Sequence, residues 1–143
     1  MEHHQPEQPI EPPRNLIKST IAVIAGFFTV VLASLASDQI LHMLNVYPPW
    51  GQPMVNAGLN FLALSYRLLY TTLGGYITAR LAPQHPLRHA VILGLIGLVP
   101  GVAGVVVSLS LQNVGPVWYP IALVITGVPC TWIGGHLFQQ SHL

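Results

Sequence analysis

One arginine lies inside a long apolar segment and is the residue most able to do chemistry. Arg67 follows Leu59 by eight residues in an apolar run that extends to Leu81. At about 1.5 Å of rise per helical residue, this position lies roughly 12 Å into a membrane. A guanidinium at such a depth costs on the order of 2.5–3.5 kcal/mol and normally faces a partner. We therefore expect the charge of Arg67 to be paired.

Asp38 is the natural partner of Arg67. It follows the first apolar run, Ile21 to Ala36, and is the only acidic residue beyond the N-terminal tail. The arginine side chain can extend toward the outer face, and a guanidinium suits a two-pronged bond to a carboxylate. We expect the pair to pin the first helix to the second. In the alternative interpretation, Arg67 attracts an anion or a lipid headgroup and Asp38 is its gate.

Two more residues complete a candidate polar cluster, which consists of Asp38, His42, Arg67 and Tyr70. His42 lies four residues after Asp38, a spacing that places both on one face of a helix. Tyr70 lies one turn from Arg67, and Tyr66 directly precedes it. Such a cluster can bind a ligand or relay a proton, although tyrosines at this depth are also common as interfacial anchors.

The sequence contains no recognisable pattern of an enzyme or of a cofactor site. No nucleophile stands beside a base at a known spacing. Metal-ligand spacings, phosphate-binding loops and dinucleotide fingerprints are also missing from the sequence. We expect no catalytic residue, no metal and no cofactor. A haem held between His89 and His136, both near predicted inner helix ends, is the alternative.

The composition excludes an ordinary soluble domain. Of the 143 residues, 52% are apolar and 6% are charged, whereas soluble domains carry roughly 25% charged residues. Four apolar runs are each long enough to cross a hydrocarbon core of roughly 30 Å as a helix. We predict an all-α, polytopic membrane protein with a four-helix transmembrane domain at residues 16–138, its helices at about 17–37, 59–81, 89–111 and 117–138.

The distribution of basic residues predicts the orientation of these helices. Arg14 and Lys18 precede the first helix, and Arg80 and Arg88 flank the connection between the second and third. The other two connections contain no Lys or Arg, and basic residues favour the cytoplasmic side. We expect both chain ends in the cytoplasm, with a disordered, proline-rich tail at residues 1–15 and a short tail at 139–143. The aromatic residues expected as anchors at the outer interface are Tyr47, Trp50, Trp118 and Tyr119.

The first apolar run permits a second interpretation. Arg14 and Lys18, an apolar stretch and then Ser34-Leu35-Ala36 are also the features of a signal peptide with its cleavage site. The acidic, proline-rich lead is unusual for such a peptide, so we expect the first helix to be retained. If cleavage followed Ala36, three helices would remain and Asp38 would lose its anchor.

Small residues indicate where the helices pack. Transmembrane helices associate through close backbone contact, which small side chains permit. The third helix carries a stripe of such residues, among them Gly94, Gly97, Gly101 and Gly104. We expect this stripe to be a packing seam, and the alternative is the lining of a substrate path. Gly74-Gly75 in the second helix and Gly134-Gly135 in the fourth form a faint internal repeat.

Four stretches of the sequence resemble one group of proteins. They are residues 66–83, 89–94, 115–120 and 129–135, which read YRLLYTTLGGYITARLAP, HAVILG, GPVWYP and PCTWIGG. These stretches resemble small four-helix bacterial membrane proteins of unassigned function, and the likeness extends over roughly residues 19–138. The resemblance implies a multi-pass protein of the bacterial inner membrane with four helices. It implies no activity and no binding residues.

These observations favour a non-enzymatic membrane component: a scaffold, an accessory subunit or a small-molecule binder. The alternative is a small transporter or channel that uses the polar cluster, and a membrane-embedded enzyme is a third possibility. The expected partners are the lipid bilayer and either a second copy of the chain or another membrane protein. Nucleic acid is not an expected partner, because the net charge is +1 and the five Lys and Arg residues are not clustered.

Overall fold

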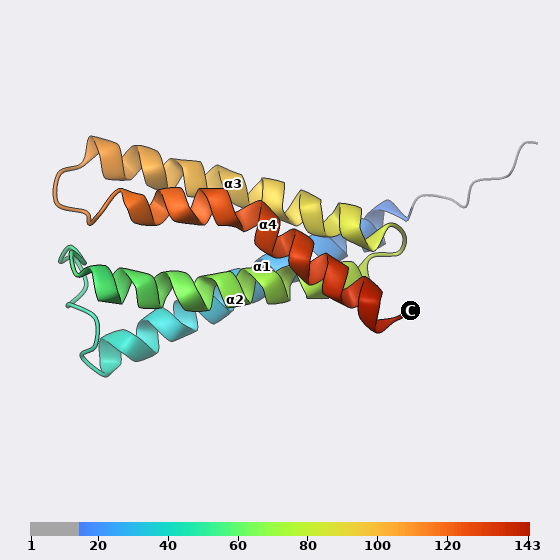
Figure 1. Cartoon of the computed structure of the whole chain (residues 1–143), viewed down its shortest axis with the longest axis horizontal. Helices are drawn as coiled ribbons and strands as arrows, with labels where there is room; N and C mark the ends of the chain where they lie inside the picture. The colour runs from blue at the N-terminus through green and yellow to red at the C-terminus, as the bar shows by residue number, and fades with distance from the viewer. Residues whose placement is uncertain (1–14) are drawn as a thin grey trace, which may run out of the picture.

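The structure, a computed structural model, describes residues 15–143, and within them it consists of four α-helices. These are α1 (Leu16–Met43), α2 (Ala57–Leu81), α3 (Pro86–Ser110) and α4 (Trp118–Ser141). They run alternately up and down as two hairpins, α1–α2 and α3–α4 (Figure 1). The predicted all-α fold is confirmed for the described residues. The tail predicted at residues 1–15 lies outside them, apart from Asn15.

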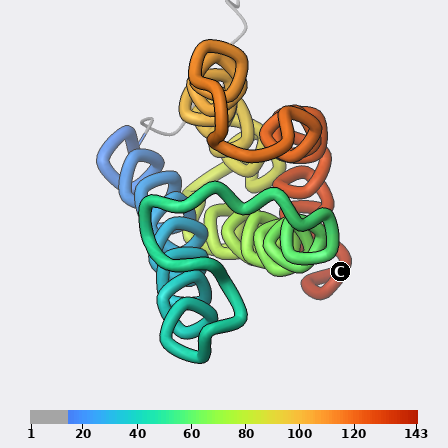
Figure 2. Tube along the Cα trace, turned by 90° about the vertical axis from the view of Figure 1, so that its left-hand side faces the viewer, coloured from blue at the N-terminus to red at the C-terminus, as the bar shows by residue number. Residues whose placement is uncertain are grey.

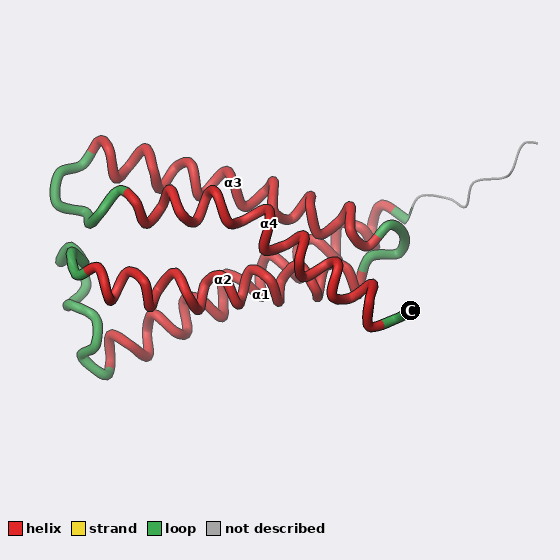
Figure 3. The backbone as a smooth tube through the Cα atoms, in the orientation of Figure 1, coloured by secondary structure: helices red, strands yellow, loops and turns green. Residues whose placement is uncertain are grey.

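The two ends of the bundle differ in their connections and in their charge. The long-loop end holds the connections 44–56 and 111–117, drawn green at the left of Figure 3. The basic end holds Lys18, Arg80 and Arg88 together with the short connection 82–85 and the end of α4. The two hairpins approach each other at the basic end and diverge toward the long-loop end (Figure 1).

The least apolar helix, α2, is the central one. α1, α3 and α4 are long and apolar enough to cross a membrane. α2 is also 25 residues long but carries polar residues such as Asn60 and Arg67. It packs against all three other helices, whereas α1 and α4 lie on either side of it without contacting each other (Figure 2). The side chains of Asn60 and Arg67 therefore face protein, where partners can satisfy them.

The contact between α2 and α4 depends on two glycines near the basic end. A Cβ on Gly75 would clash with the backbone of Thr131, and a Cβ on Gly134 would clash with the backbone of Thr72. Each glycine lies three residues after the threonine that the other glycine faces, so the contact is reciprocal. Close approach of two backbones at small residues is the main source of attraction between helices in lipid.

The other glycine of each Gly-Gly pair packs against the first helix of its own hairpin. Gly74 lies against Gly26 and Val30 of α1, and Gly135 lies against Ala90 and Leu87 of α3. The faint internal repeat thus marks equivalent tasks in the two hairpins: one glycine joins the hairpins, and its neighbour holds the first helix of its own hairpin.

The predicted packing seam along α3 is wrong in part. Gly94 packs closely against Val128 of α4, and Gly101 packs against Val124 of the same helix. Among residues 15–143, a Cβ on Gly97 would meet nothing within 4 Å, and one on Gly104 would meet only Pro120, at 3.7 Å. The seam is therefore interrupted: Gly94 and Gly101 share the face toward α4, whereas Gly97 and Gly104 each follow three residues later and lie roughly 60° around the helix from that face.

α1 ends at Met43 and not at residue 37 as predicted. It closes with a Schellman motif, in which the Val46 N–H donates to the Leu41 carbonyl at 3.0 Å and the Asn45 N–H donates to the His42 carbonyl at 3.1 Å. Asn45 takes a left-handed conformation with a φ of 57°, which asparagine tolerates better than most residues. The charge of Asp38 does not end the helix, because its carboxylate faces α2.

The bounds of α3 and α4 also differ from the prediction. α3 begins at Pro86 instead of residue 89, with the proline in the first turn, where its missing N–H costs nothing. α4 continues to Ser141, so most of the tail predicted at 139–143 is helical. The Phe138 ring packs edge-on against Tyr76 of α2, with 5.6 Å between ring centroids, and this contact holds the end of α4 on the bundle.

The glycine contact between α2 and α4 gives a stability prediction. Gly75→Ala and Gly134→Ala each place a methyl group against a backbone that cannot move aside, and each should destabilise the fold by about 1–3 kcal/mol. The measurement is thermal unfolding in mild detergent, followed by size-exclusion chromatography. Gly97→Ala is the matched control, since its methyl group meets open space. Equal melting temperatures for all three variants would contradict the packing described.

Candidate functional site

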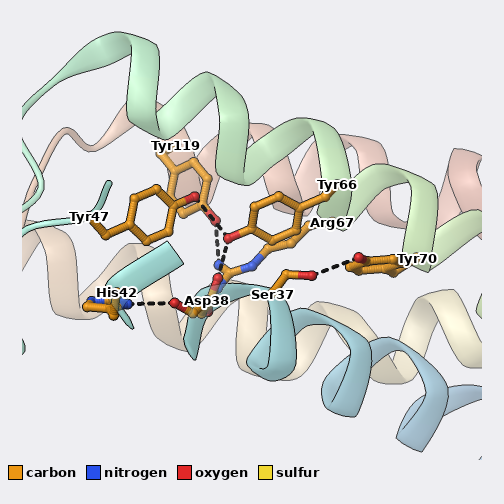
Figure 4. Close-up of polar contacts among 8 residues, drawn as sticks. All are labelled: Ser37, Asp38, His42, Tyr47, Tyr66, Arg67, Tyr70 and Tyr119. Atoms are coloured by element: carbon orange, nitrogen blue, oxygen red, sulfur yellow. Dashed lines mark hydrogen bonds and ion pairs between the residues drawn. The ribbon is translucent and has the colours of Figure 1, made fainter. Parts of the chain in front are cut away.

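Arg67 joins three helices through its guanidinium. Its Nη2 donates to Oδ2 of Asp38 on α1 at 2.5 Å. Its Nη1 donates to the phenol oxygen of Tyr119, in the first turn of α4 (Figure 4). The side chain of Asp38 is 13% exposed and that of Arg67 is 28% exposed. The ion pair therefore neutralises a charge that the apolar surroundings would otherwise leave unbalanced.

A chain of hydrogen bonds connects this ion pair to the long connection 44–56. The Tyr66 hydroxyl donates to Oδ1 of Asp38, which as a carboxylate only accepts. The Tyr66 oxygen is then the acceptor for the Tyr47 hydroxyl, 2.9 Å away. Tyr47 belongs to the connection, yet it is only 5% exposed (Figure 4). Burial raises the pKa of the Tyr47 phenol above its usual value, so the phenol stays protonated and can donate at neutral pH.

Local backbone interactions fix the position of Tyr47. The Schellman motif at the end of α1 turns the chain back, and the Tyr47 N–H itself donates to the Leu41 carbonyl at 3.2 Å. At the other end of the connection, the Asn60 side chain donates to the Met54 carbonyl at 2.8 Å. Asn56 caps α2 by accepting from the Leu59 N–H at 3.2 Å. The connection is therefore tied down at both ends, although it has no helix or strand of its own.

Three of the four residues of the predicted polar cluster, Asp38, His42 and Arg67, line one small cavity at the long-loop end. Asp38 and Arg67 form the expected ion pair. The His42 ring donates from Nδ1 to the backbone carbonyl of Asp38 at 2.7 Å and stacks on Trp50, with 3.9 Å between ring centroids. It makes no hydrogen bond to the carboxylate. Tyr70 pairs with the Ser37 hydroxyl at 2.7 Å, beside the cluster and outside the hydrogen-bond chain.

Three phenols take the places that the prediction gave to His42 and Tyr70. Tyr47 and Tyr119 were expected as interfacial anchors, and Tyr66 was noted only as a neighbour of Arg67. We name the five connected residues the Arg67 network; they are Asp38, Tyr47, Tyr66, Arg67 and Tyr119. The available signal was that the Arg67 side chain can extend toward the outer face, where Tyr47 and Tyr119 were expected and where a buried hydroxyl needs a polar partner.

Two cavities meet at the Arg67 network. The larger, of about 340 Å³, lies between the two hairpins and is lined by all four helices, for example by Phe27, Thr71, Gly97 and Gly127. The smaller, of about 220 Å³, lies at the long-loop end under the connection 44–56. Arg67 lines both cavities, so the network separates an apolar space inside the bundle from a more polar space at its end.

No protein-family model, curated protein or solved structure matches the chain. Its class is defined by the helices. Three of them are long and apolar enough to cross a membrane, and they pack around a fourth that carries a neutralised ion pair. The chain is a multi-pass helical membrane protein.

The Arg67 network gives a prediction about coupling. Arg67→Ala leaves the Asp38 carboxylate without its counter-charge, and each single alanine variant should lose about 3 kcal/mol of stability. The double variant should lose clearly less than the sum, because no lone buried charge remains. The measurement is chemical unfolding of the four proteins in detergent. Tyr76→Phe is the control: Tyr76 lies nine residues along α2 from Arg67, near the basic end, so its effect should add to that of Arg67→Ala. Simple additivity between Asp38→Ala and Arg67→Ala would show that the pair contributes no coupling energy.

Proposed function

We propose that the protein is a non-enzymatic membrane component that binds a small lipophilic molecule in the cavity between its two hairpins. The observation that carries this proposal is the 340 Å³ space lined by all four helices, with Arg67 the one charged residue among the residues that line it. Ligand pockets of proteins measure roughly 300–1,000 Å³ and combine apolar walls with a few polar groups.

Two glycines in the walls of the cavity keep it open, because glycine has no side chain to fill the space. Gly97 on α3 and Gly127 on α4 both line it, and a Cβ on either would meet no atom of the described part of the chain within 4 Å. Larger residues at these positions would fill the space from two sides without disturbing the helix contacts. The cavity is partly open to its surroundings, and its lining atoms lack van der Waals partners within the protein. A ligand in the cavity would supply them.

Transport across the membrane is the second candidate. It is favoured by one observation: Arg67 lines both the cavity and the smaller space at the long-loop end, so that movement of its side chain would connect them. The basic end argues against it. There Gly75 and Gly134 bring the backbones of α2 and α4 into direct contact, and a passage would require these helices to separate. Binding needs no such movement.

We also propose four spans, with both chain ends in the cytoplasm of a bacterium and the protein in its inner membrane. α2 runs antiparallel to α1 and α3 and is as long as α3, which supports a fourth span. Lys18, Arg80 and Arg88 all lie at the basic end, which supports a cytoplasmic location for that end. Retention of α1 is supported by its packing, since Gly26 lies against Gly74 and Thr78 of α2.

Filling the cavity tests the proposed binding. Gly97→Leu should leave the melting temperature of the empty protein unchanged or higher, and should lower the amount of co-purifying lipophilic molecule at least tenfold. The measurement is mass spectrometry of organic extracts from protein purified in mild detergent. Ala103→Leu is the matched control, because Ala103 is exposed on the same helix and does not line the cavity. Identical extracts from wild type and both variants would oppose the proposal.

Cysteine labelling tests the topology. In a Cys130→Ala background, single cysteines at Gln52 and Asn113 should react with a membrane-impermeant maleimide added to intact bacterial cells whose outer membrane has been permeabilised. A cysteine at Gln84 should react only after the inner membrane is opened. The mass of the intact purified protein, measured by mass spectrometry, should equal that of a chain that still contains α1. Labelling from outside at position 84 but not at position 52 would show that the orientation is the reverse of the proposed one. Labelling from outside at both positions would show that α2 does not cross the membrane.

A further inference from the structure

The polar groups that line the large cavity are few, and their hydrogen-bonding capacity is almost used up. Besides Arg67, the polar side chains are Thr71 and Thr131. The Thr71 hydroxyl donates to the Arg67 carbonyl at 2.7 Å, and the Thr131 hydroxyl donates to the Val128 carbonyl at 3.0 Å. Both protons are therefore occupied, and Arg67 is the only side chain lining the cavity that can still donate.

The guanidinium of Arg67 has donors that the network does not use. Nη1 donates to Tyr119 and Nη2 donates to Asp38, but Nε is buried and has no partner among the described residues. A guanidinium carries five N–H groups. An unpaired buried donor is costly, and a hydrogen bond to a charged donor is stronger than one between neutral groups. Because two of the five N–H groups are used and Arg67 lines the cavity, an acceptor at this end of the cavity can be held by the remaining N–H groups of Nη1 and Nη2.

The charge of the site selects an uncharged acceptor. Asp38 already balances Arg67, so an anion in the cavity would lose its hydration and meet no excess positive charge. A cation would face a guanidinium. The remaining lining, including Phe27, Val30 and Leu93, is apolar and suits a hydrocarbon body. A neutral carbonyl oxygen on such a body satisfies all of these conditions.

We propose that the ligand of this cavity is an uncharged lipophilic molecule with a carbonyl oxygen that accepts a hydrogen bond from Arg67. This inference rests on the proposed binding function and names the chemical class of its ligand. The molecule enters from the bilayer between the hairpins, its carbonyl oxygen lies at the Arg67 end of the cavity, and its hydrocarbon body extends toward Gly97 and Thr131.

Benzophenone is a suitable probe, because it is apolar, carries one carbonyl and forms a covalent bond with nearby C–H groups under near-ultraviolet light. The full chain is reconstituted in lipid nanodiscs and irradiated with the probe, and labelled peptides are identified by mass spectrometry. Labelling should fall on the cavity segments 27–31 and 93–101. Dicyclohexyl ketone should suppress it at about a tenfold lower concentration than dicyclohexylmethane, which has nearly the same shape without the carbonyl.

Two variants separate the claims. Arg67→Lys keeps the positive charge beside Asp38 but loses the spare N–H groups of Nη1 and Nη2, so it should reduce the preference for the ketone to about twofold or less. Gly97→Leu should abolish cavity labelling altogether, whereas Ala103→Leu should leave it unchanged. The competition between the ketone and the hydrocarbon is measured on wild-type protein. It therefore tests the carbonyl inference even if Arg67→Lys does not fold.

The possible failures are distinguishable. If Gly97→Leu abolishes labelling but the ketone and the hydrocarbon compete equally on wild type, the cavity binds ligands and the carbonyl inference is overturned. If labelling of the cavity segments is absent, or is insensitive to Gly97→Leu, the proposed binding function itself fails. A ketone preference that persists in a folded Arg67→Lys variant would overturn the assignment of Arg67 as the donor.

Discussion

Neutralising one guanidinium in an apolar bundle is the constraint on which the rest of this structure depends. Arg67 needs a counter-charge and acceptors at its own depth, and it finds them on α1 and α4. This requirement fixes which faces of α1, α2 and α4 meet at the long-loop end. Tyr66 and Tyr47 then extend the same requirement to the connection 44–56, because the second carboxylate oxygen of Asp38 also needs a donor. An apolar bundle has few other interactions that specify orientation so strictly.

The two ends of the bundle are held by different physics. At the basic end, glycines let backbones touch, and dispersion between closely packed atoms does the work. At the long-loop end, the hairpins diverge, and the contacts between them include the hydrogen bond from Arg67 to Tyr119 and the Phe61 ring on Trp118, with 4.8 Å between ring centroids. The cavity is the geometric consequence. It lies where the glycine contacts end and the polar contact has not yet begun, between Thr131 and Arg67.

The sequence was sufficient for the features that follow from a single strong rule. A lone acidic residue and a lone intramembrane arginine must meet, and Asp38 and Arg67 do. Apolar length predicted the four helices. It did not predict the end of α1, since that depends on a Schellman motif at Asn45, a local signal that the charge of Asp38 obscured. Nor did it predict Tyr119, which lies 52 residues from Arg67 and reaches it only because α2 and α4 pack together. The prediction that Gly97 packs against another helix was wrong for a related reason. A stripe of small residues on one helix does not show where a neighbouring helix diverges from it.

The open positions on α3 and α4 argue that the cavity is a feature and not a packing fault. A fault would be expected where bulky residues fit badly, yet Gly97 and Gly127 leave space from both walls with no neighbour that requires a glycine. Glycine is a poor helix former, so its presence without a close contact lowers stability and brings no packing gain. Gly94 and Gly101 on the same helix α3 do have close contacts with α4, so helix packing explains why they are glycines. It does not explain why Gly97 and Gly127 are glycines. A bound lipophilic body would provide the contact that the other helices do not. On this argument Gly97 and Gly127 shape the cavity, and Arg67 orients what enters it.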